Sequence, residues 1–174
     1  LHYFPVMAGE IEFYLYAKPS HPEHKMGQTQ CFDVDAPNSY QTVLENIEIE
    51  AKKQNIQITA IVAESSSGQF EINLQHSADI LKLSDDMMAI KRIVKQSASM
   101  QGLNASFMAK PNMLSAGSGL HFHMSVLNQF QQNICAMDEL KKPNQRMGQM
   151  IAGLIQLMPA SMAILAPMNC MSPY

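Results

Sequence analysis

The 174-residue chain is long enough for one domain with a hydrophobic core and too short for two full domains. Apolar residues make up 47% of it and charged residues 16%, a composition that is typical of globular proteins and excludes an intrinsically disordered chain. The formal net charge of -3 provides no basic surface, so nucleic-acid binding is not expected as the main function.

Cysteine content and hydropathy indicate a reduced, cytoplasmic protein. Cys31, Cys135 and Cys170 are odd in number and far apart, which excludes a CxxC zinc site and disfavours a disulfide framework. We expect no signal peptide at Leu1. The apolar stretch from Met150 to Ala166 is interrupted by glutamine, proline and serine, and it falls short of the ~20 apolar residues of a membrane-spanning helix. We therefore expect a buried helix there and no membrane contact.

The first half of the chain predicts three strands and one helix. Apolar and polar side chains alternate from Pro5 to Ala17, as in a strand with one buried face. The polar segment from Lys18 to Pro37 predicts a long surface loop. A helix is expected after Asn38-Ser39. It is followed by a buried strand, a serine-glycine turn and an alternating strand, at 56–63, 65–68 and 69–75.

The second half predicts two further helices and two further strands. Ser84 is the expected cap of a helix from Asp85 to Met100, because acidic residues fill its first turn and a glycine follows its end. A strand from Leu103 to Ala109 and an alternating strand from Leu120 to Leu127 come next. The last elements are a polar loop and a helix from about Gln145 that is bent or broken at a proline, at 128–144 and 159.

This order of elements predicts the α+β class. The expected helices fall between strands, but the short turn at 65–68 makes the hairpin around it antiparallel. We expect a mostly antiparallel sheet with helices packed on one face and an acidic metal-binding face on the other.

Acidic and histidine side chains recur on the polar face of two of these strands. Glu10 and Glu12 are two residues apart, so both side chains leave the same face of a strand, with apolar residues behind them. His121 and His123 repeat this arrangement, backed by Leu120, Phe122, Met124 and Val126. A single Glu-x-Glu or His-x-His pair is more often a solvated sheet face, but their joint occurrence favours a metal site.

Two more glutamates flank the predicted hairpin. Glu71 shares a strand face with Gln69 and Asn73, and the serine turn brings Glu64 close to it. Four carboxylates gathered in one place would repel one another unless cations neutralised them. Oxygen ligands with one imidazole suit Mg²⁺ or Mn²⁺ better than zinc or copper, and such ions typically hold phosphates.

Four segments of the chain resemble, in order and spacing, the signature blocks of the glutamine synthetase family. They read Ala-Gly-Glu-Ile-Glu-Phe-Tyr-Leu, Gly-Gln-Phe-Glu-Ile-Asn-Leu, Phe-Met-Ala-Lys-Pro and Gly-Ser-Gly-Leu-His-Phe-His-Met-Ser, at 8–15, 68–74, 107–111 and 117–125. The resemblance spans nearly the whole chain. It implies that residues 1–174 are the central part of a catalytic domain. The family's amino-terminal β-grasp domain and the carboxy-terminal part of its catalytic domain would then be absent.

The resemblance also implies roles for individual residues, and each is an expectation. The metal beside the amino-acid substrate would be held by Glu12, Glu64 and Glu71. Glu10 and His121 would hold a second metal at the nucleotide phosphates. His123 and Ser125 would contact ATP, and Gly117 would contact glutamate through its backbone.

The implied activity is that of an ATP-dependent carboxylate–amine ligase. Glutamate would be phosphorylated on its γ-carboxylate, and ammonia or a small amine would then displace phosphate. The implied cofactors are two or more Mg²⁺ or Mn²⁺ ions with ATP as co-substrate, and the implied assembly is a homo-oligomeric ring. Because family active sites lie between subunits and use segments outside this chain, we expect the chain alone to be inactive.

One departure from the family pattern bears on the acceptor. The family loop usually reads Asn-Gly-Ser-Gly, whereas this chain has Ala116 in place of the asparagine, which tilts the expectation from ammonia towards a larger amine.

The alternative to a ligase is a non-catalytic structural or regulatory relative. Lys110 is expected to be a surface charge, and His2, His21, His24 and His76 to be solvated. Tyr14 and Tyr16 either line the site or pack at the surface, and surface packing is favoured.

Overall fold

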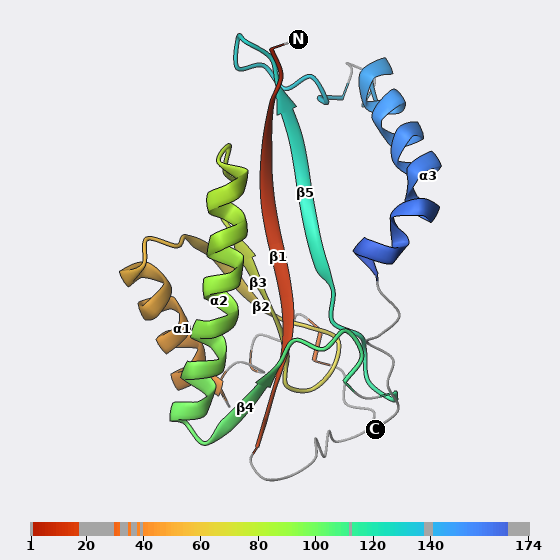
Figure 1. Cartoon of the computed structure of the whole chain (residues 1–174). Helices are drawn as coiled ribbons and strands as arrows, with labels where there is room; N and C mark the ends of the chain where they lie inside the picture. The colour runs from red at the N-terminus through yellow and green to blue at the C-terminus, as the bar shows by residue number, and fades with distance from the viewer. Residues whose placement is uncertain are drawn as a thin grey trace.

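The structure is a computed structural model that describes residues 2–17, 30–31, 35, 38, 40–111, 113–137 and 141–166. Most of the predicted loop at 18–37, together with His21, His24 and Cys170, lies outside the described residues. The elements, in chain order, are β1 (Phe4–Ala17), α1 (Gln41–Lys53), β2 (Ile58–Ala63), β3 (Gln69–Leu74), α2 (Ile80–Met100), β4 (Leu103–Ser106), β5 (Leu120–Leu127) and α3 (Gln145–Leu165) (Figure 1).

One antiparallel sheet of five strands organises the molecule, with the long strand β1 as its spine (Figure 1). β3 pairs with β1 along one edge, and β2 pairs with β3 beyond it. β5 pairs with the first part of β1, from Phe4 to Ile11, and β4 pairs with its last part, from Tyr14 to Ala17. The α+β class and the antiparallel sheet with helices are confirmed.

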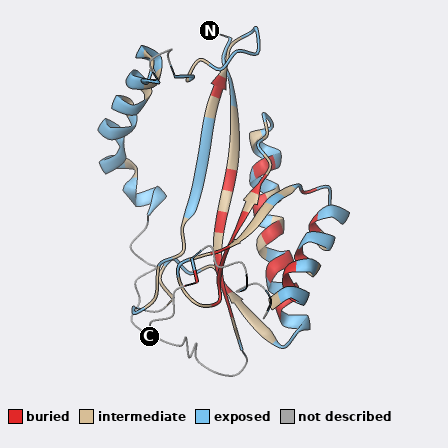
Figure 2. Ribbon diagram, turned by 180° about the vertical axis from the view of Figure 1, so that it is seen from behind, coloured by how far each residue is buried: buried red, intermediate tan, exposed pale blue. Residues whose placement is uncertain are grey.

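The hydrophobic core lies between the sheet and the two helices α1 and α2, which cover one of its faces (Figure 2). Period-2 alternation along β1 sends Ile11, Phe13 and Leu15 into this core, each no more than 1% exposed. The helices present apolar faces in return, which include Val43, Leu44, Ile47 and Ala51 from α1 and Leu83, Met87, Ile90, Ile93, Val94 and Ala98 from α2. The opposite parity of β1 is left for polar side chains.

Two boundaries, the start of α2 and the end of β4, differ from the prediction by three residues or more. α2 begins at Ile80, because the side chain of Asp79 caps it by accepting a hydrogen bond of 3.0 Å from the Lys82 amide. Ser84, the predicted cap, lies inside the helix and donates its hydroxyl to the Ile80 carbonyl. β4 ends at Ser106, three residues before the predicted end.

The predicted burial of the last helix, and of three of the four apolar side chains of β5 behind the histidines, is wrong for the described chain; the fourth, Val126, is buried. The side chains behind His121 and His123 were expected in the core, but Leu120, Phe122 and Met124 are 48–52% exposed, because β5 lies beyond the sheet area that α1 and α2 cover. α3 runs unbroken through Pro159 and has no buried residue (Figure 2). By length and composition alone α3 could cross a bilayer, which is weak evidence for a membrane segment.

Candidate metal centre

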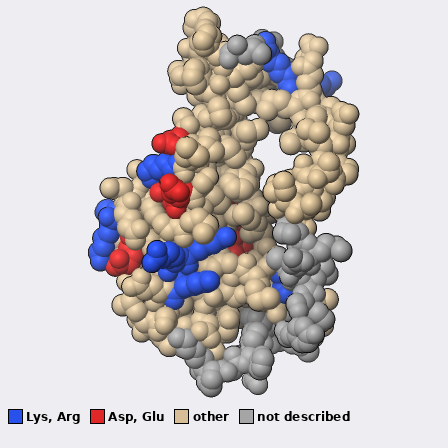
Figure 3. Space-filling model, in the orientation of Figure 1, with Lys and Arg blue, Asp and Glu red and all other residues tan. Residues whose placement is uncertain are grey.

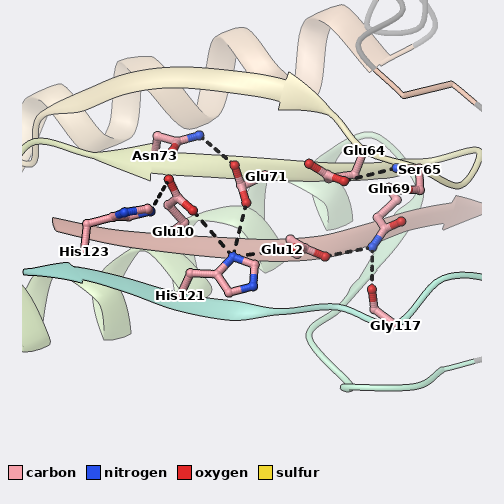
Figure 4. Close-up of polar contacts among 10 residues, drawn as sticks. All are labelled: Glu10, Glu12, Glu64, Ser65, Gln69, Glu71, Asn73, Gly117, His121 and His123. Atoms are coloured by element: carbon pink, nitrogen blue, oxygen red, sulfur yellow. Dashed lines mark hydrogen bonds and ion pairs between the residues drawn. The ribbon is translucent and has the colours of Figure 1, made fainter. Parts of the chain in front are cut away.

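Strand register brings the predicted ligands together on the sheet face opposite the helices. Glu12 on β1 is paired with Glu71 on β3, and Glu10 is paired with His121 on β5. Because these positions share one parity, all four side chains leave the same face, and Figure 4 shows them pointing toward one another. β1, β3 and β5 are therefore neighbours in the sheet, which strand parity alone does not determine.

His121 is the meeting point of the cluster. Its Nδ1 lies 3.5 Å from Glu10 Oε2, 3.8 Å from Glu71 Oε2 and 4.0 Å from Glu12 Oε1 (Figure 4). One ligand atom each from Glu10, Glu71 and His121 lie within 4.8 Å of one another, a spacing that a single divalent cation could bridge. This trio combines Glu71 from the first of the two ligand sets that the family resemblance implies with Glu10 and His121 from the second.

Glu64 completes the acidic group from the end of the β2–β3 hairpin. Its backbone amide donates to the Gln69 carbonyl at 2.9 Å, which fixes it beside β3, and its carboxylate accepts from the Ser65 amide at 3.2 Å. Burial raises the pKa of Glu64, and the charges of Glu12 and Glu71 raise it further. A bound cation would reduce the repulsion among these carboxylates.

Two further predicted residues continue along β5 away from the cluster. His123 Nε2 lies 2.9 Å from Glu10 Oε1, so Glu10 contacts both histidines. Ser125 is paired with Val6 and lies four residues beyond His121, roughly 13 Å along the strand at about 3.3 Å per residue. The structure thus places Ser125 on the same strand face as the histidines but outside the group of carboxylates.

The glycine loop that precedes β5 closes the other end of the cluster. The Gly119 carbonyl accepts a hydrogen bond of 3.1 Å from the Glu12 amide, and a Cβ at Gly119 would lie 2.6 Å from His121 Nε2 and 2.9 Å from Glu12 Oε1. A Cβ at Gly117 would lie 2.9 Å from the Ala109 carbonyl oxygen. Side chains at these two positions would therefore collide with the loop or the ligands, which is the physical reason for glycine there.

Side chains from β1, the β2–β3 turn and the segment after β4 hold this loop in place, a role that was not predicted from the sequence. Tyr14 donates its hydroxyl to the Ala116 carbonyl at 2.7 Å, and the Ser66 hydroxyl accepts from the Ala116 amide at 2.9 Å. Lys110 Nζ donates to the Ser115 carbonyl at 2.5 Å. Tyr14 is fully buried, so its expected place at the surface is wrong, and Lys110 is a half-buried loop tie rather than a free surface charge.

Two amide side chains contact the carboxylates directly. Gln69 Nε2 donates to Glu12 Oε2 at 3.0 Å, and Asn73 Nδ2 donates to Glu71 Oε1 at 3.0 Å (Figure 4). Both amides share the strand parity of Glu71, and that parity was the sequence signal that could have identified them.

The donor set fits a hard divalent cation. Carboxylate oxygens with one imidazole nitrogen favour Mg²⁺ or Mn²⁺, whereas zinc and copper sites draw more on thiolates and imidazoles. The side chains of Glu12 and Glu71 are only 11% and 12% exposed, while that of His121 is 54% exposed. The carboxylates thus line the floor of the site, and its open side is available to a ligand.

Comparison with known proteins identifies relatives over the whole chain. The sequence model of the family described as glutamine synthetase, catalytic domain, matches residues 1–171. Gamma-glutamylputrescine synthetase PuuA of Escherichia coli strain K12 is 40% identical over 176 aligned residues, which cover 94% of this chain and 37% of that protein. Glutamate–isopropylamine ligase of a Pseudomonas species is 28% identical over 172, which cover 92% of this chain and 37% of that protein.

A solved structure shares the fold as well. The structure titled GmaS/ADP complex, conformation 1, superposes with a TM-score of 0.84 at 26% sequence identity, and the match covers 99% of this chain and 41% of that one. The chain therefore spans about two-fifths of the length of the relatives it matches.

Proposed function

Because the chain belongs to the glutamine synthetase family, we propose that it forms part of the catalytic domain of an ATP-dependent carboxylate–amine ligase. The product would be a γ-glutamyl amide, made from glutamate and an amine through γ-glutamyl phosphate. Residues 1–174 would supply the metal-binding sheet face and the loop that receives glutamate. The family membership rests on the match over residues 1–171.

The observation that carries this proposal is the order of groups along β5 and the loop before it. From the loop outward lie Gly117, the carboxylates around His121, then His123 and finally Ser125. A ligand set of this extent suits two substrates placed end to end, with charge neutralised in the middle. Glutamate at the loop and a nucleotide lying along β5 would bring the γ-carboxylate and the terminal phosphate together at the carboxylate cluster.

We assign the metal ligands to two groups within this cluster. Glu12, Glu64 and Glu71 would hold the ion beside glutamate, and Glu10 with His121 would hold the ion at the nucleotide phosphates. Mg²⁺ or Mn²⁺ bound there would neutralise charge on the transferring phosphoryl group and orient it. Asn73 and Gln69, which donate hydrogen bonds to Glu71 and Glu12, would keep two of these carboxylates in place.

The chain's own residues would bind and align the substrates. The backbone of Gly117 would contact glutamate, and the imidazole of His123, oriented by Glu10 Oε1 at 2.9 Å, would contact the phosphates. Ser125 would contact the nucleotide further along β5. A γ-carboxylate oxygen would attack the terminal phosphorus of ATP and release ADP. The amine nitrogen would then attack the resulting acyl carbon, and phosphate would leave with loss of a proton from nitrogen.

The acceptor is proposed to be an amine larger than ammonia. Ala116 carries only a methyl group where the family loop usually has asparagine, which leaves the volume of the longer side chain free. Tyr14 and Ser66 hold the backbone of Ala116 in place, so the loop does not move into this volume. Gamma-glutamylputrescine synthetase, at 40% identity, and glutamate–isopropylamine ligase are named for such acceptors. We further propose a cytoplasmic, homo-oligomeric enzyme.

The test is amine-dependent phosphate release by the full-length protein, with ATP, glutamate and Mg²⁺ held constant. Putrescine, ethanolamine, methylamine and ammonia are compared as acceptors. Release with a larger amine is expected, and a preference for ammonia would show that the interpretation of Ala116 is wrong. No release with any acceptor would favour the non-catalytic alternative.

Glu71→Ala provides the matched check on the assigned site. Its activity should fall at least a hundredfold, because the variant removes a largely buried ligand of the cluster, while Glu48→Ala on the exposed side of α1 should stay near wild type. Full activity of Glu71→Ala would contradict the proposed metal site.

A further inference from the structure

Gln69 is the side chain that joins the carboxylate cluster to the glycine loop. It is the first residue of β3 and is 1% exposed. Its Nε2 donates one hydrogen bond to Glu12 Oε2 at 3.0 Å and another to the Gly117 carbonyl at 2.9 Å (Figure 4). A single amide group therefore bridges one proposed metal ligand and the proposed glutamate contact.

The orientation of this amide is fixed by its surroundings. Gln69 Oε1 accepts a hydrogen bond of 3.1 Å from the Ser66 amide, so the oxygen faces a donor while Nε2 faces two acceptors. A flipped amide would place the oxygen against a carboxylate and a carbonyl, and it would leave the Ser66 amide without an acceptor. Both hydrogens of the amide nitrogen are used, and neither is available for another role.

The backbone around Gln69 is held as firmly as its side chain. Its carbonyl accepts from Gln30 Nε2 at 2.5 Å and from the Glu64 amide at 2.9 Å. Gln30 Oε1 in turn accepts from the Gly68 amide at 3.0 Å. The side-chain amide of Gln69 therefore extends from a well-anchored backbone at the start of β3. A displacement of the loop or of Glu12 would strain or break its hydrogen bond to this amide.

We infer that Gln69 is a positioning residue that couples the placement of Glu12 to the placement of the Gly117 loop. This inference rests on the proposed function, because it assigns to Gln69 the alignment of the metal ligand with the glutamate site. Loss of the amide would leave the carbonyl of Gly117 and one oxygen of Glu12 without their buried donor, so both would shift or recruit water. Metal binding and glutamate binding should therefore weaken together.

The experiment compares Gln69→Met and Gln69→Asn in the full-length protein. Methionine keeps the length of the side chain without donors, while asparagine keeps the amide but is one methylene too short to reach both acceptors. Mn²⁺ alone is titrated by electron paramagnetic resonance, and the KM for glutamate is measured at saturating ATP and amine. In Gln69→Met, we expect the Mn²⁺ dissociation constant and the KM to rise by about tenfold to a hundredfold each. The shorter variant should change both in the same direction.

A control variant separates this role from a loss of stability. Ser97→Ala removes a 3.0 Å hydrogen bond from Asn46 between α1 and α2, on the other side of the sheet from the site. It should lower Tm but leave the Mn²⁺ dissociation constant and the KM for glutamate within twofold of wild type. If Gln69→Met does not fold, the same two constants are measured for Gln69→Asn.

The outcomes distinguish this inference from the proposed function. If Glu71→Gln weakens Mn²⁺ binding while folded Gln69 variants leave both constants within twofold of wild type, the role of Gln69 is wrong and the metal site stands. A change in only one of the two constants would also overturn the coupling. If Glu71→Gln leaves Mn²⁺ binding unchanged, the proposed metal site is wrong, and the role of Gln69 fails with it.

Discussion

At the scale of single residues, the main feature is an accumulation of like charge on one sheet face. Glu12, Glu64 and Glu71 repel one another, and the raised pKa of Glu64 reflects first its burial and then that repulsion. Strand pairing places Glu12 directly opposite Glu71, so these two side chains leave the sheet side by side. The metal-free chain therefore carries an electrostatic cost that a cation removes.

Replacement of one carboxylate tests this cost. Without metal, Glu71→Gln should raise the free energy of unfolding by about 1 kcal/mol, because it removes one of the repelling charges. With Mn²⁺ at about a hundred times its dissociation constant, wild type should gain about 2.7 kcal/mol and Glu71→Gln much less. Urea unfolding with a chelator and then with Mn²⁺ measures both effects. Glu48→Gln is the control, and an equal response of both variants would contradict the account.

The stability of the protein at alkaline pH should depend on Tyr40. Tyr40 packs its ring edge-on against Phe70 at 5.3 Å, and burial raises the pKa of its hydroxyl above the ordinary value of 10.0. The folded state therefore holds this proton more tightly than the unfolded state. Its contribution leaves stability unchanged below pH 10 and lowers it as pH rises from 10 through the raised pKa.

Tyr40→Phe should flatten that decline. The variant keeps the ring contact with Phe70 and removes the ionisable group. Its free energy of unfolding should lie within about 0.5 kcal/mol of wild type near pH 8, and it should exceed wild type above pH 10. Urea unfolding at a series of pH values measures the difference. Parallel curves above pH 10 would show that Tyr40 does not contribute. The buried Tyr14 shifts in the same direction, so some decline should remain.

At the scale of elements, the identity of the capping residue determines where α2 begins. Asp79→Ala should lower the free energy of unfolding by about 1 kcal/mol, because its carboxylate caps the helix through the Lys82 amide. Ser84→Ala should change it by less than about 0.5 kcal/mol, since that hydroxyl only returns to the Ile80 carbonyl inside the helix. Thermal and urea unfolding compare the two variants. A larger loss from Ser84→Ala would contradict the observed boundary.

Strands were predictable from this sequence where polar and apolar side chains alternate. Alternation alone identified β1 within one residue and β5 at both ends, Leu120 and Leu127. The start of α2 was missed because the acidic residues after Ser84 resemble the first turn of a helix. The capping residue, Asp79, lies five positions earlier. Tyr14 was misplaced because its strand parity is polar, whereas the residue is buried and its hydroxyl contacts the loop at Ala116.

The candidate site was predictable as a set of residues but not as a geometry. Parity gave the common face of each Glu-x-Glu or His-x-His pair, whereas strand order and register depend on contacts between distant segments. A slip of one residue between β1 and β5 would have sent His121 to the other face. Parity placed Gln69 on the carboxylate face, but its bridge between Glu12 and Gly117 could not be assigned, since these two acceptors lie 57 and 48 residues away along the chain.

At the scale of the whole molecule, apolar surface is distributed unevenly. Charged side chains gather over α1 and α2, whereas the surface of α3 is almost entirely uncharged (Figure 3). One stripe of α3 forms an open apolar groove, lined by Ile151, Leu154, Ile155, Met158, Pro159 and Met162. The back of β5 is half-exposed as well. Contiguous apolar surface of this kind drives association in water.

We therefore expect the 174-residue chain to self-associate through the α3 groove. Ile155 is 70% exposed, and burying such a side chain stabilises a contact by about 1–2 kcal/mol, so Ile155→Lys should weaken association about tenfold. The free energy of unfolding should change by less than about 0.5 kcal/mol, because no described residue of α3 is buried. Sedimentation velocity over a range of concentrations measures the association. Leu81→Lys is the control, since Leu81 is 80% exposed but lies on α2, away from the groove. A wild-type chain that stays monomeric, or an equal effect of Leu81→Lys, would mean that the groove does not mediate association.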